Sequence, residues 1–431
     1  VTPERAADRA WLFKHVVTQE VAYESMPFAV RTMLHGRVGR YLEALDPGGG
    51  AARLDLLAHH FWLGDDETRK RAYLARAADA ARYANTAAIT YYERLVPLLE
   101  GPDRVAAMRN LAKVLELSGA WPRAEEVLVD ARARASAAGD VAAVAWCDAS
   151  LAEVTRKQGR FDDAVARLDA ASAGFEAAGA DDGLGQVLHL AGTVAAQRGD
   201  LPGARTRYEQ SLAIRERLGD RAGMAALYSN LGVVAEYGGD YAAARAYNER
   251  ALHLRTEIGD RWAIAVSHNN LGMIALHERR FEEARDRFRE SMRLNREVGD
   301  AWMVAIGHNN LGNAHRGLGD LDAARRDYAA SLTAYRAWDD RWAMAFLLED
   351  IGVLAARRGD RVAPFELLGA AEAMRADIGS PRADALQEEL DGHLAEALVA
   401  LGDEAADAAV RRGKALTLDE AIARALAVCS I

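Results

Sequence analysis

The stretch that decides the fold runs from residue 259 to residue 300 and reads GDRWAIAVSHNNLGMIALHERRFEEARDRFRESMRLNREVGD. It begins and ends with Gly-Asp, and Arg279-Arg280 stands halfway between the two pairs. Gly favours the left-handed conformation just past a helix, and Asp favours the cap position of the next one. The stretch therefore predicts two helices of roughly 15–18 residues, here named helix A and helix B.

The same punctuation recurs along the chain in two series that each have a period of 40 residues. The glycines stand at 119, 159, 199, 239, 319 and 359 in one series, and at 139, 179, 219, 259, 299 and 379 in the other. Arg279 and Asp339 occupy the missing slots. Seven consecutive units fit between about residue 100 and residue 379. Because one helix pair cannot bury its own apolar face, neighbouring pairs must stack.

The apolar residues follow helical spacing within each unit. In the unit that begins at residue 220, the steps of three and four place the following side chains on one buried stripe: Met224, Leu227, Tyr228, Leu231, Val234 and Ala235. Helix B of that unit carries Ala244, Ala251 and Leu252 in the same way.

These units resemble the tetratricopeptide repeat. Leu-Gly pairs at 231, 271 and 311 are similar to that of its first helix, and Ala284-x3-Phe288 is similar to the Ala-x3-Phe of its second. The unit is longer than the usual ~34 residues, and Gly-Asp replaces the terminal Pro. The resemblance implies an all-α fold, a right-handed α-α superhelix of about seven 40-residue helix pairs with divergent helical ends, in which helix A lines the concave surface.

The regions outside the repeats divide the rest of the chain. Residues 1–46 resemble the end of a winged-helix region in bacterial STAND-type signalling ATPases, and a helical cap is the alternative. Residues 47–99 are expected to form divergent helical pairs, residues 100–379 the seven repeats, and residues 380–431 a C-terminal helical cap. The last segment also resembles the tail of those regulators.

The composition argues against several classes of function. The net charge of -10 disfavours direct nucleic-acid binding, and no apolar run is long enough for a membrane span. The only Gly-Lys, Gly413-Lys414, lacks the rest of a phosphate-binding loop. Cys147 and Cys429 show no metal or disulfide spacing, which favours two buried thiols in a reducing, cytoplasmic setting. We expect no catalytic site, no cofactor and no metal.

Three other periodic features have structural interpretations. His268 and His308 precede the Leu-Gly pairs and are predicted to be core histidines. Trp262, Trp302 and Trp342 start successive A helices and are predicted to be packing anchors. One arginine per unit, at 205, 245, 285 and 325, predicts an inter-repeat seam of ion pairs, with an anion-binding strip as the alternative.

The candidate binding site is a column of amides on helix A. Asn230, Asn270 and Asn310 precede the Leu-Gly pairs, and Asp350 takes the same place in the next unit. An amide can donate to and accept from the backbone of an extended peptide. The same face is predicted to include Asn269, Asn309, Asn313, Val266, Met273, Ile306 and Phe346. The alternative is that each amide binds the adjacent repeat and sets the superhelical twist.

The sequence thus predicts a non-catalytic module that binds a protein or peptide in its concave groove. The resemblance to STAND-type and adenylate-cyclase-like proteins implies a sensor or regulatory arm. A small-molecule-sensing arm of a transcriptional activator and a constitutive scaffold stay open as alternatives, as does homo-oligomerisation.

Overall fold

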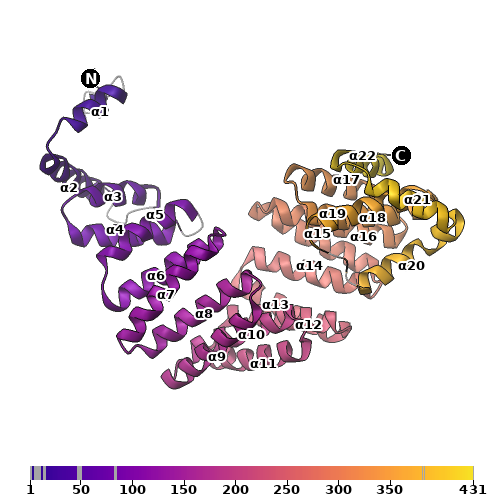
Figure 1. Ribbon diagram of the computed structural model, residues 1–431, viewed down its shortest axis with the longest axis horizontal. Coiled ribbons are helices and arrows are strands. Elements are labelled where there is room, and N and C mark those ends of the chain that lie inside the picture. The colour runs from indigo at the N-terminus through magenta and orange to yellow at the C-terminus, as the bar shows by residue number, and fades with distance from the viewer. Residues whose placement is uncertain are drawn as a thin grey trace. The chain divides into compact units, whose positions relative to one another are not determined.

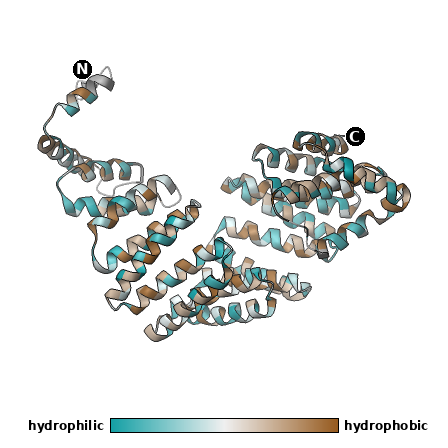
Figure 2. Ribbon diagram, viewed as in Figure 1, coloured by the Kyte–Doolittle hydropathy of each residue, from teal (hydrophilic) through white to brown (hydrophobic). Residues whose placement is uncertain are grey.

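The structure, a computed structural model, describes residues 2–3, 11–12, 16–45, 51–81, 85–380, 382 and 384–430 (Figure 1). The chain divides into two compact units, residues 1–200 and residues 201–431. Each unit is built from consecutive antiparallel helices, so the predicted all-α solenoid of helix pairs is confirmed. Brown and teal alternate along the helices in Figure 2, as expected where each helix buries one stripe.

Unit 1 begins with the two-residue strands β1 (Thr2–Pro3) and β2 (Trp11–Leu12), which pair antiparallel. Its helices are α1 (Val16–Glu24), α2 (Phe28–Leu45), α3 (Ala51–Leu63), α4 (Glu67–Ala80), α5 (Asn85–Leu95), the 3-10 turn η1 (Val96–Leu98), α6 (Gly101–Leu117), α7 (Trp121–Ala137), α8 (Val141–Lys157), α9 (Phe161–Ala178) and α10 (Asp181–Gln197).

Unit 2 contains α11 (Leu201–Leu218), α12 (Arg221–Tyr237), α13 (Tyr241–Ile258), α14 (Arg261–His277), α15 (Phe281–Val298), α16 (Ala301–Leu318), α17 (Leu321–Ala337), α18 (Arg341–Arg357), α19 (Ala363–Asp377), α20 (Asp384–Leu401), α21 (Asp403–Lys414) and α22 (Leu418–Ser430). In chain order, α6 to α19 are the seven predicted pairs, and the even-numbered helices of this set are the A helices.

The Gly-Asp punctuation ends and restarts the helices as predicted. Every glycine of the two series has φ between 62° and 86°, the left-handed region that a side chain disfavours. Arg279 and Asp339, which fill the missing slots, adopt the same conformation at 59° and 50°. Among the aspartates, Asp260 accepts a hydrogen bond from the Ala263 N–H, and Asp300 accepts one from the Met303 N–H, both at 3.0 Å. Local signals alone therefore set these boundaries.

The Leu-Gly pair is explained by packing between the two helices of a repeat. Phe288 of α15 is completely buried. A Cβ placed on Gly272 of α14 would lie 2.5 Å from the Phe288 Cε1 atom. Gly312 meets the ring of Tyr328 in the same way, at 2.3 Å. The glycine is thus required because the aromatic ring of helix B lies directly on the backbone of helix A.

The predicted stripe of the unit that begins at residue 220 is buried over most of its length. Leu227, Tyr228, Leu231 and Val234 are buried, while Met224 is partly exposed. No helix among the described residues has both the length and the apolarity needed to span a membrane.

Candidate functional site

The predicted amide column of unit 2 lies at the junctions between A helices. The Asn270 Nδ2 atom donates to Ser229 Oγ at 3.3 Å and to Asn248 Oδ1 at 3.2 Å, both in the preceding repeat. Asn310 is buried and donates to Asn269 Oδ1 at 2.9 Å. Asn230 is partly buried. These bonds join successive repeats, which supports the inter-repeat interpretation, and ligand binding through this column stays a prediction.

The column ends in a charged cluster around Asp350. Its carboxylate accepts hydrogen bonds from Asn309 at 3.3 Å and Asn313 at 3.1 Å, and it pairs with Arg316 at 3.3 Å. Burial raises the pKa of Asp350 although the Arg316 guanidinium opposes this shift. Tyr328, which is fully buried, donates its hydroxyl to Asn313 Oδ1 at 2.7 Å. The carboxylate of Asp350 is thus satisfied within the protein, whereas the Oδ1 atom of Asn309 is buried without a hydrogen-bond partner among the described residues.

The four apolar residues predicted for this face are partly buried. Met273 packs against the cluster that contains Phe288, and Ile306 packs against the core of the last repeats. Val266 is also partly buried, and the Phe346 ring lies 4.0 Å from the Arg375 guanidinium carbon.

The prediction that His268 and His308 are core histidines is wrong. Both are partly exposed and make polar contacts: the Nδ1 atom of His308 lies 2.9 Å from Asp327 Oδ1, and that of His268 lies 3.4 Å from Arg287. The buried neighbours are Ser267 and Gly307. A helix turns about 100° per residue, so one position of register moves a side chain out of the core.

The tryptophans that start the A helices are not buried. Trp262, Trp302 and Trp342 are 50%, 46% and 53% exposed. Two of them instead form hydrogen bonds to the next repeat. The Nε1 of Trp262 donates to Asp300 at 3.0 Å, and that of Trp302 donates to Asp340 at 3.1 Å. Each bond reaches the aspartate that caps the next A helix.

The arginine series is only partly the predicted seam. Arg245 pairs with Glu278 and Glu283 of the following repeat. Arg205 pairs instead with Glu209 of its own helix. Arg285 likewise pairs with its neighbour Asp286. Surface pairs of this kind stabilise a protein little.

A hollow of about 470 Å³ lies in unit 1, on the face of α6, α8 and α10. We name the A-helix face by its register: residues 226, 230 and 233 together with the positions 40, 80 or 120 residues away. The hollow is lined at these positions by Asn110, Lys113, Trp146, Ser150, Glu153, Gln186, Leu190 and Thr193. The predicted face is therefore hollowed in repeats that precede the predicted ones.

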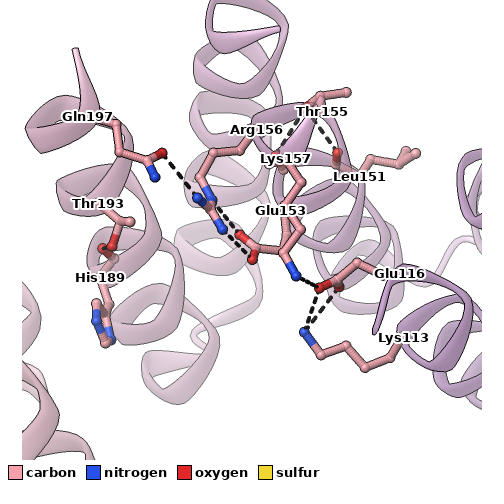
Figure 3. Close-up of polar contacts among 11 residues, drawn as sticks. Lys113, Glu116, Leu151, Glu153, Thr155, Arg156, Lys157, His189, Thr193 and Gln197 are labelled. Atoms are coloured by element: carbon pink, nitrogen blue, oxygen red, sulfur yellow. Dashed lines mark hydrogen bonds and ion pairs between the residues drawn. The ribbon is translucent and has the colours of Figure 1, made fainter. Parts of the chain in front are cut away.

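Charged side chains are fixed along one wall of this hollow (Figure 3). Glu116 is 4% exposed and accepts from Lys113 at 3.0 Å and from Lys157 at 2.7 Å. Glu153 accepts two hydrogen bonds from Arg156, at 2.8 and 2.7 Å. Burial opposes ionisation of Glu153, but the bond to Arg156 and the positive charges of Arg156, Lys113 and Lys157 together outweigh it and lower the pKa of the carboxyl. Both carboxylates are therefore already occupied.

Arg156 extends this network to the next repeat, because its Nη1 donates to Gln197 Oε1 at 3.0 Å (Figure 3). Side chains of α6, α8 and α10 are thus held in place around the hollow, so that a ligand would meet a preformed surface.

Arg109 differs from these cations. Its guanidinium carbon lies 4.8 Å from the centre of the Trp146 ring, and its Nε is buried without a hydrogen-bond partner among the described residues. No ion pair of the described part of the chain includes Arg109. Burial lowers the pKa of its guanidinium. A partly buried cation without a carboxylate partner would gain from binding an anion.

A second hollow, of about 530 Å³, adjoins the first. It is lined by residues of α4, α5 and α6, among them Arg71, Tyr92 and Asp103, and by Leu99, and it shares Asn110 with the first hollow. The two hollows are therefore neighbours on unit 1. The sequence contains a signal for this location. The positions 80 and 120 residues before Asn230 are Ser150 and Asn110, which are polar residues in the same register.

Other chemistry is not assembled in the described residues. No group of three or more His, Cys, Asp or Glu among them is arranged to hold a metal ion. The two cysteines are buried and free, as predicted. Burial raises the pKa of the Cys147 thiol to about 11, so it is protonated and unreactive at neutral pH.

Family models for the tetratricopeptide repeat match residues 140–217, 223–297 and 309–337. These segments therefore carry tetratricopeptide repeats. No curated protein sequence matches the chain.

Solved structures with a similar fold include a Rap protein complexed with competence and sporulation factor. It is 13% identical, with a TM-score of 0.54 over 82% of this chain and 98% of that one. A STAND protein with a tetratricopeptide repeat sensor from Pyrococcus horikoshii is 14% identical, with a TM-score of 0.48, 90% of this chain covered and 54% of that one. A Rap conjugation regulator of plasmid pLS20 with the Phr* peptide is 17% identical, with a TM-score of 0.48, 65% and 77% covered.

Proposed function

We propose that this chain is a non-catalytic module that binds an extended, acidic peptide segment along the A-helix face of unit 1. The observation that carries the proposal is Arg109, a cation without a carboxylate partner that lies on Trp146 at the wall of a preformed hollow. A carboxylate from a ligand would supply the missing charge and hydrogen bonds.

The other lining residues suit a peptide. Asn110 and Gln186 carry amides that can donate to and accept from a peptide backbone. Trp146 and Leu190 offer apolar surface for a neighbouring side chain. Polar groups that fix orientation beside apolar contact surface are typical of ligand sites.

The charge balance favours an anionic ligand. Arg109, Lys113 and Arg156 line the hollow, against the carboxylates of Glu116 and Glu153. Lys113 and Arg156 are neutralised by these two carboxylates, and Arg109 is left over. The first hollow is thus locally positive in a protein whose net charge is -10, whereas the second has Arg71 against Asp79 and Asp103, so we expect the acidic residue of the ligand at the first. That net charge also disfavours nucleic acid as the partner.

The shape favours an extended ligand over a compact one. Hollows of about 470 and 530 Å³ meet at Asn110 and follow α4, α6, α8 and α10. Each alone has the size of a small-molecule pocket, which keeps a small-molecule sensor as the second candidate. An extended peptide would fill both.

We further propose that the module is the sensor arm of a larger cytoplasmic regulator of the STAND or adenylate-cyclase-like type. The tetratricopeptide repeats and the resemblance of residues 1–46 to the segment after a signalling ATPase support this role. The Rap protein of similar fold was solved with competence and sporulation factor, and a ligand of that kind is what we propose here. This proposal is tested by sequencing the gene upstream of the codon for Val1, where we expect a nucleotide-binding or cyclase domain.

The peptide proposal is tested by selecting phage-displayed random 12-residue peptides on the full chain. We expect enriched peptides to contain an Asp or Glu beside an apolar residue. Their affinity, measured by fluorescence anisotropy, should fall at least tenfold in Arg109→Gln, because a charge-assisted bond contributes about 1.5–3 kcal/mol.

The matched control is Arg134→Gln on α7, whose guanidinium pairs with the exposed Asp130. This variant should bind like the wild type. Enriched peptides that bind Arg109→Gln and the wild type equally well would refute the proposed site. If no peptide is enriched, and a compact metabolite binds the wild type but not Arg109→Gln, the result would favour a small-molecule sensor.

A further inference from the structure

Helix α20 departs from the order of the other helices in unit 2. Helix α21 packs onto α19, and α22 packs onto α17, α18 and α19, whereas α20 contacts α18 and α21. Its Leu390 and Leu394 are 7% and 4% exposed and share one apolar cluster with Val353 of α18. Val353 is an A-helix face position, in register with Glu153 and Thr193 of the unit 1 hollow. Helix α20 therefore covers this face in unit 2.

The charge of α20 also acts on A helices that precede α18. Helix α20 contains five Asp and Glu residues and no Lys or Arg. A hydrogen bond to Glu236 raises the pKa of His277 on α14, and Glu389 of α20 adds to the shift. Burial lowers the pKa of Arg316 on α16, but Tyr328, Asp350 and Glu389 outweigh it and raise the value. The acid Glu389 of α20 thus favours the charged forms of His277 and Arg316 on two further A helices.

The start of α20 is tied to α18 by a buried ion-pair cluster. Glu349 pairs with Arg375 of α19 and with Arg382, which precedes α20, both at 2.7 Å. The three side chains are at most 11% exposed. Arg382 also donates to Gln387 in the first turns of α20. This cluster holds one end of the helix in place.

The rest of α20 is held less firmly. Gly392 stands in its middle, and a Cβ added there would meet nothing within 4 Å, so no close approach requires glycine. Gly in a helix interior lowers helix stability. Gly402, with φ of 85°, ends the helix, and Val399 is 86% exposed near that end. The helix therefore keeps its conformation mainly through its packing against Val353 of α18, Phe365 and Leu368 of α19, and the start of α21.

We propose that the A-helix face of α14, α16 and α18 is a docking site for an acidic amphipathic helix. Helix α20 is its intramolecular occupant, and a partner helix with the same pattern competes for the site. The pattern is Glu389-Leu390-x3-Leu394-x2-Ala397, in which the apolar residues share a cluster with Val353 and the acid favours the charged forms of His277 and Arg316. This inference concerns unit 2 and does not depend on the peptide site of unit 1.

The test uses a fluorescein-labelled peptide with the sequence of residues 384–401 and the full chain. In the wild type the tethered α20 competes at high effective concentration, so we expect weak binding. In Leu390→Glu/Leu394→Glu the tethered helix is released, and the peptide should bind at least tenfold more tightly. The control Val399→Glu changes an exposed position and should bind like the wild type.

The site is located by adding Val353→Glu to the released variant, which should abolish binding of the peptide. Circular dichroism confirms that each variant is folded. A folded released variant that does not bind the peptide would overturn the proposal. Peptide binding that survives Val353→Glu would overturn it as well.

Amide exchange provides a test that does not rely on disruptive variants. Gly392→Ala should slow exchange within α20 about fivefold, since alanine stabilises a helix interior relative to glycine, and leave α18 unchanged. This result is expected only if α20 opens by itself. Exchange of α20 that occurs only together with α16 to α19 would show an integral helix and contradict the proposal.

Discussion

Replacing Gly272 by alanine tests whether close packing, and not backbone freedom, explains the Leu-Gly pair. The added Cβ would lie 2.5, 2.7 and 3.0 Å from three ring atoms of Phe288, where about 3.5–4.0 Å is normal. The ring must move by about 1 Å within a fully buried site, and such overpacking costs about 1–3 kcal/mol. Alanine regains roughly 0.5–1 kcal/mol of helix propensity. We expect a net loss of about 1–2 kcal/mol.

The free energy of unfolding is measured by urea titration with circular dichroism, and amide exchange of α14 and α15 locates the change. Gly392→Ala is the matched control, because its Cβ has no neighbour within 4 Å and the variant should be more stable than the wild type. Phe288→Leu removes ring atoms near the added methyl group, so the double variant should lose less than the sum of the single losses. If Gly272→Ala stabilised the protein as Gly392→Ala does, the packing explanation would be refuted.

Two further predictions concern a helix cap and a histidine pair. Both Asp260 and Asp300 cap an A helix, but Asp300 also accepts the hydrogen bond from Trp262 Nε1. Asp300→Ala should therefore lower the free energy of unfolding by about 1 kcal/mol more than Asp260→Ala, as measured by urea unfolding. Equal losses would show that the indole bond contributes nothing. In unit 1, the Nδ1 atoms of His35 and His60 lie 2.8 Å apart, and burial followed by the neighbouring histidines lowers both pKa values below 6.5. Their stabilising contribution is therefore present above pH 6.5 and is lost as the pH falls below it. His60→Gln should lose less stability than the wild type between pH 7.5 and 5.5, with amide exchange of α2 and α3 as the measurement.

The repeat structure could be predicted well from the sequence, because its signals are local. Glycine at the end of one helix and aspartate at the start of the next need no tertiary contact to act. The same logic extends to Arg279 and Asp339, where a residue other than glycine adopts the left-handed conformation at the expected place. The seven helix pairs and their lengths follow from this punctuation.

The peptide site that we propose shares the register of the predicted amide column but lies in earlier repeats. The amide column of unit 2 joins neighbouring repeats, while the hollow with a free cation lies at Arg109 and Trp146 in unit 1. Polar residues with the same spacing can contact either a ligand or the next repeat. The spacing alone does not distinguish the two, because the partner of each amide depends on how closely the helices approach.

By itself the sequence determined where each helix of the repeats begins and ends, and which face of each A helix belongs to the shared register. The tertiary structure decided which part of that face is open. At Glu153 the position borders a hollow, whereas at Val353 the same position packs with Leu390 of α20. Helix boundaries depend on residues a few positions apart, but the accessibility of a face depends on segments far away in the chain. The occupant of the A-helix face could therefore be identified only once α20 was placed against α18.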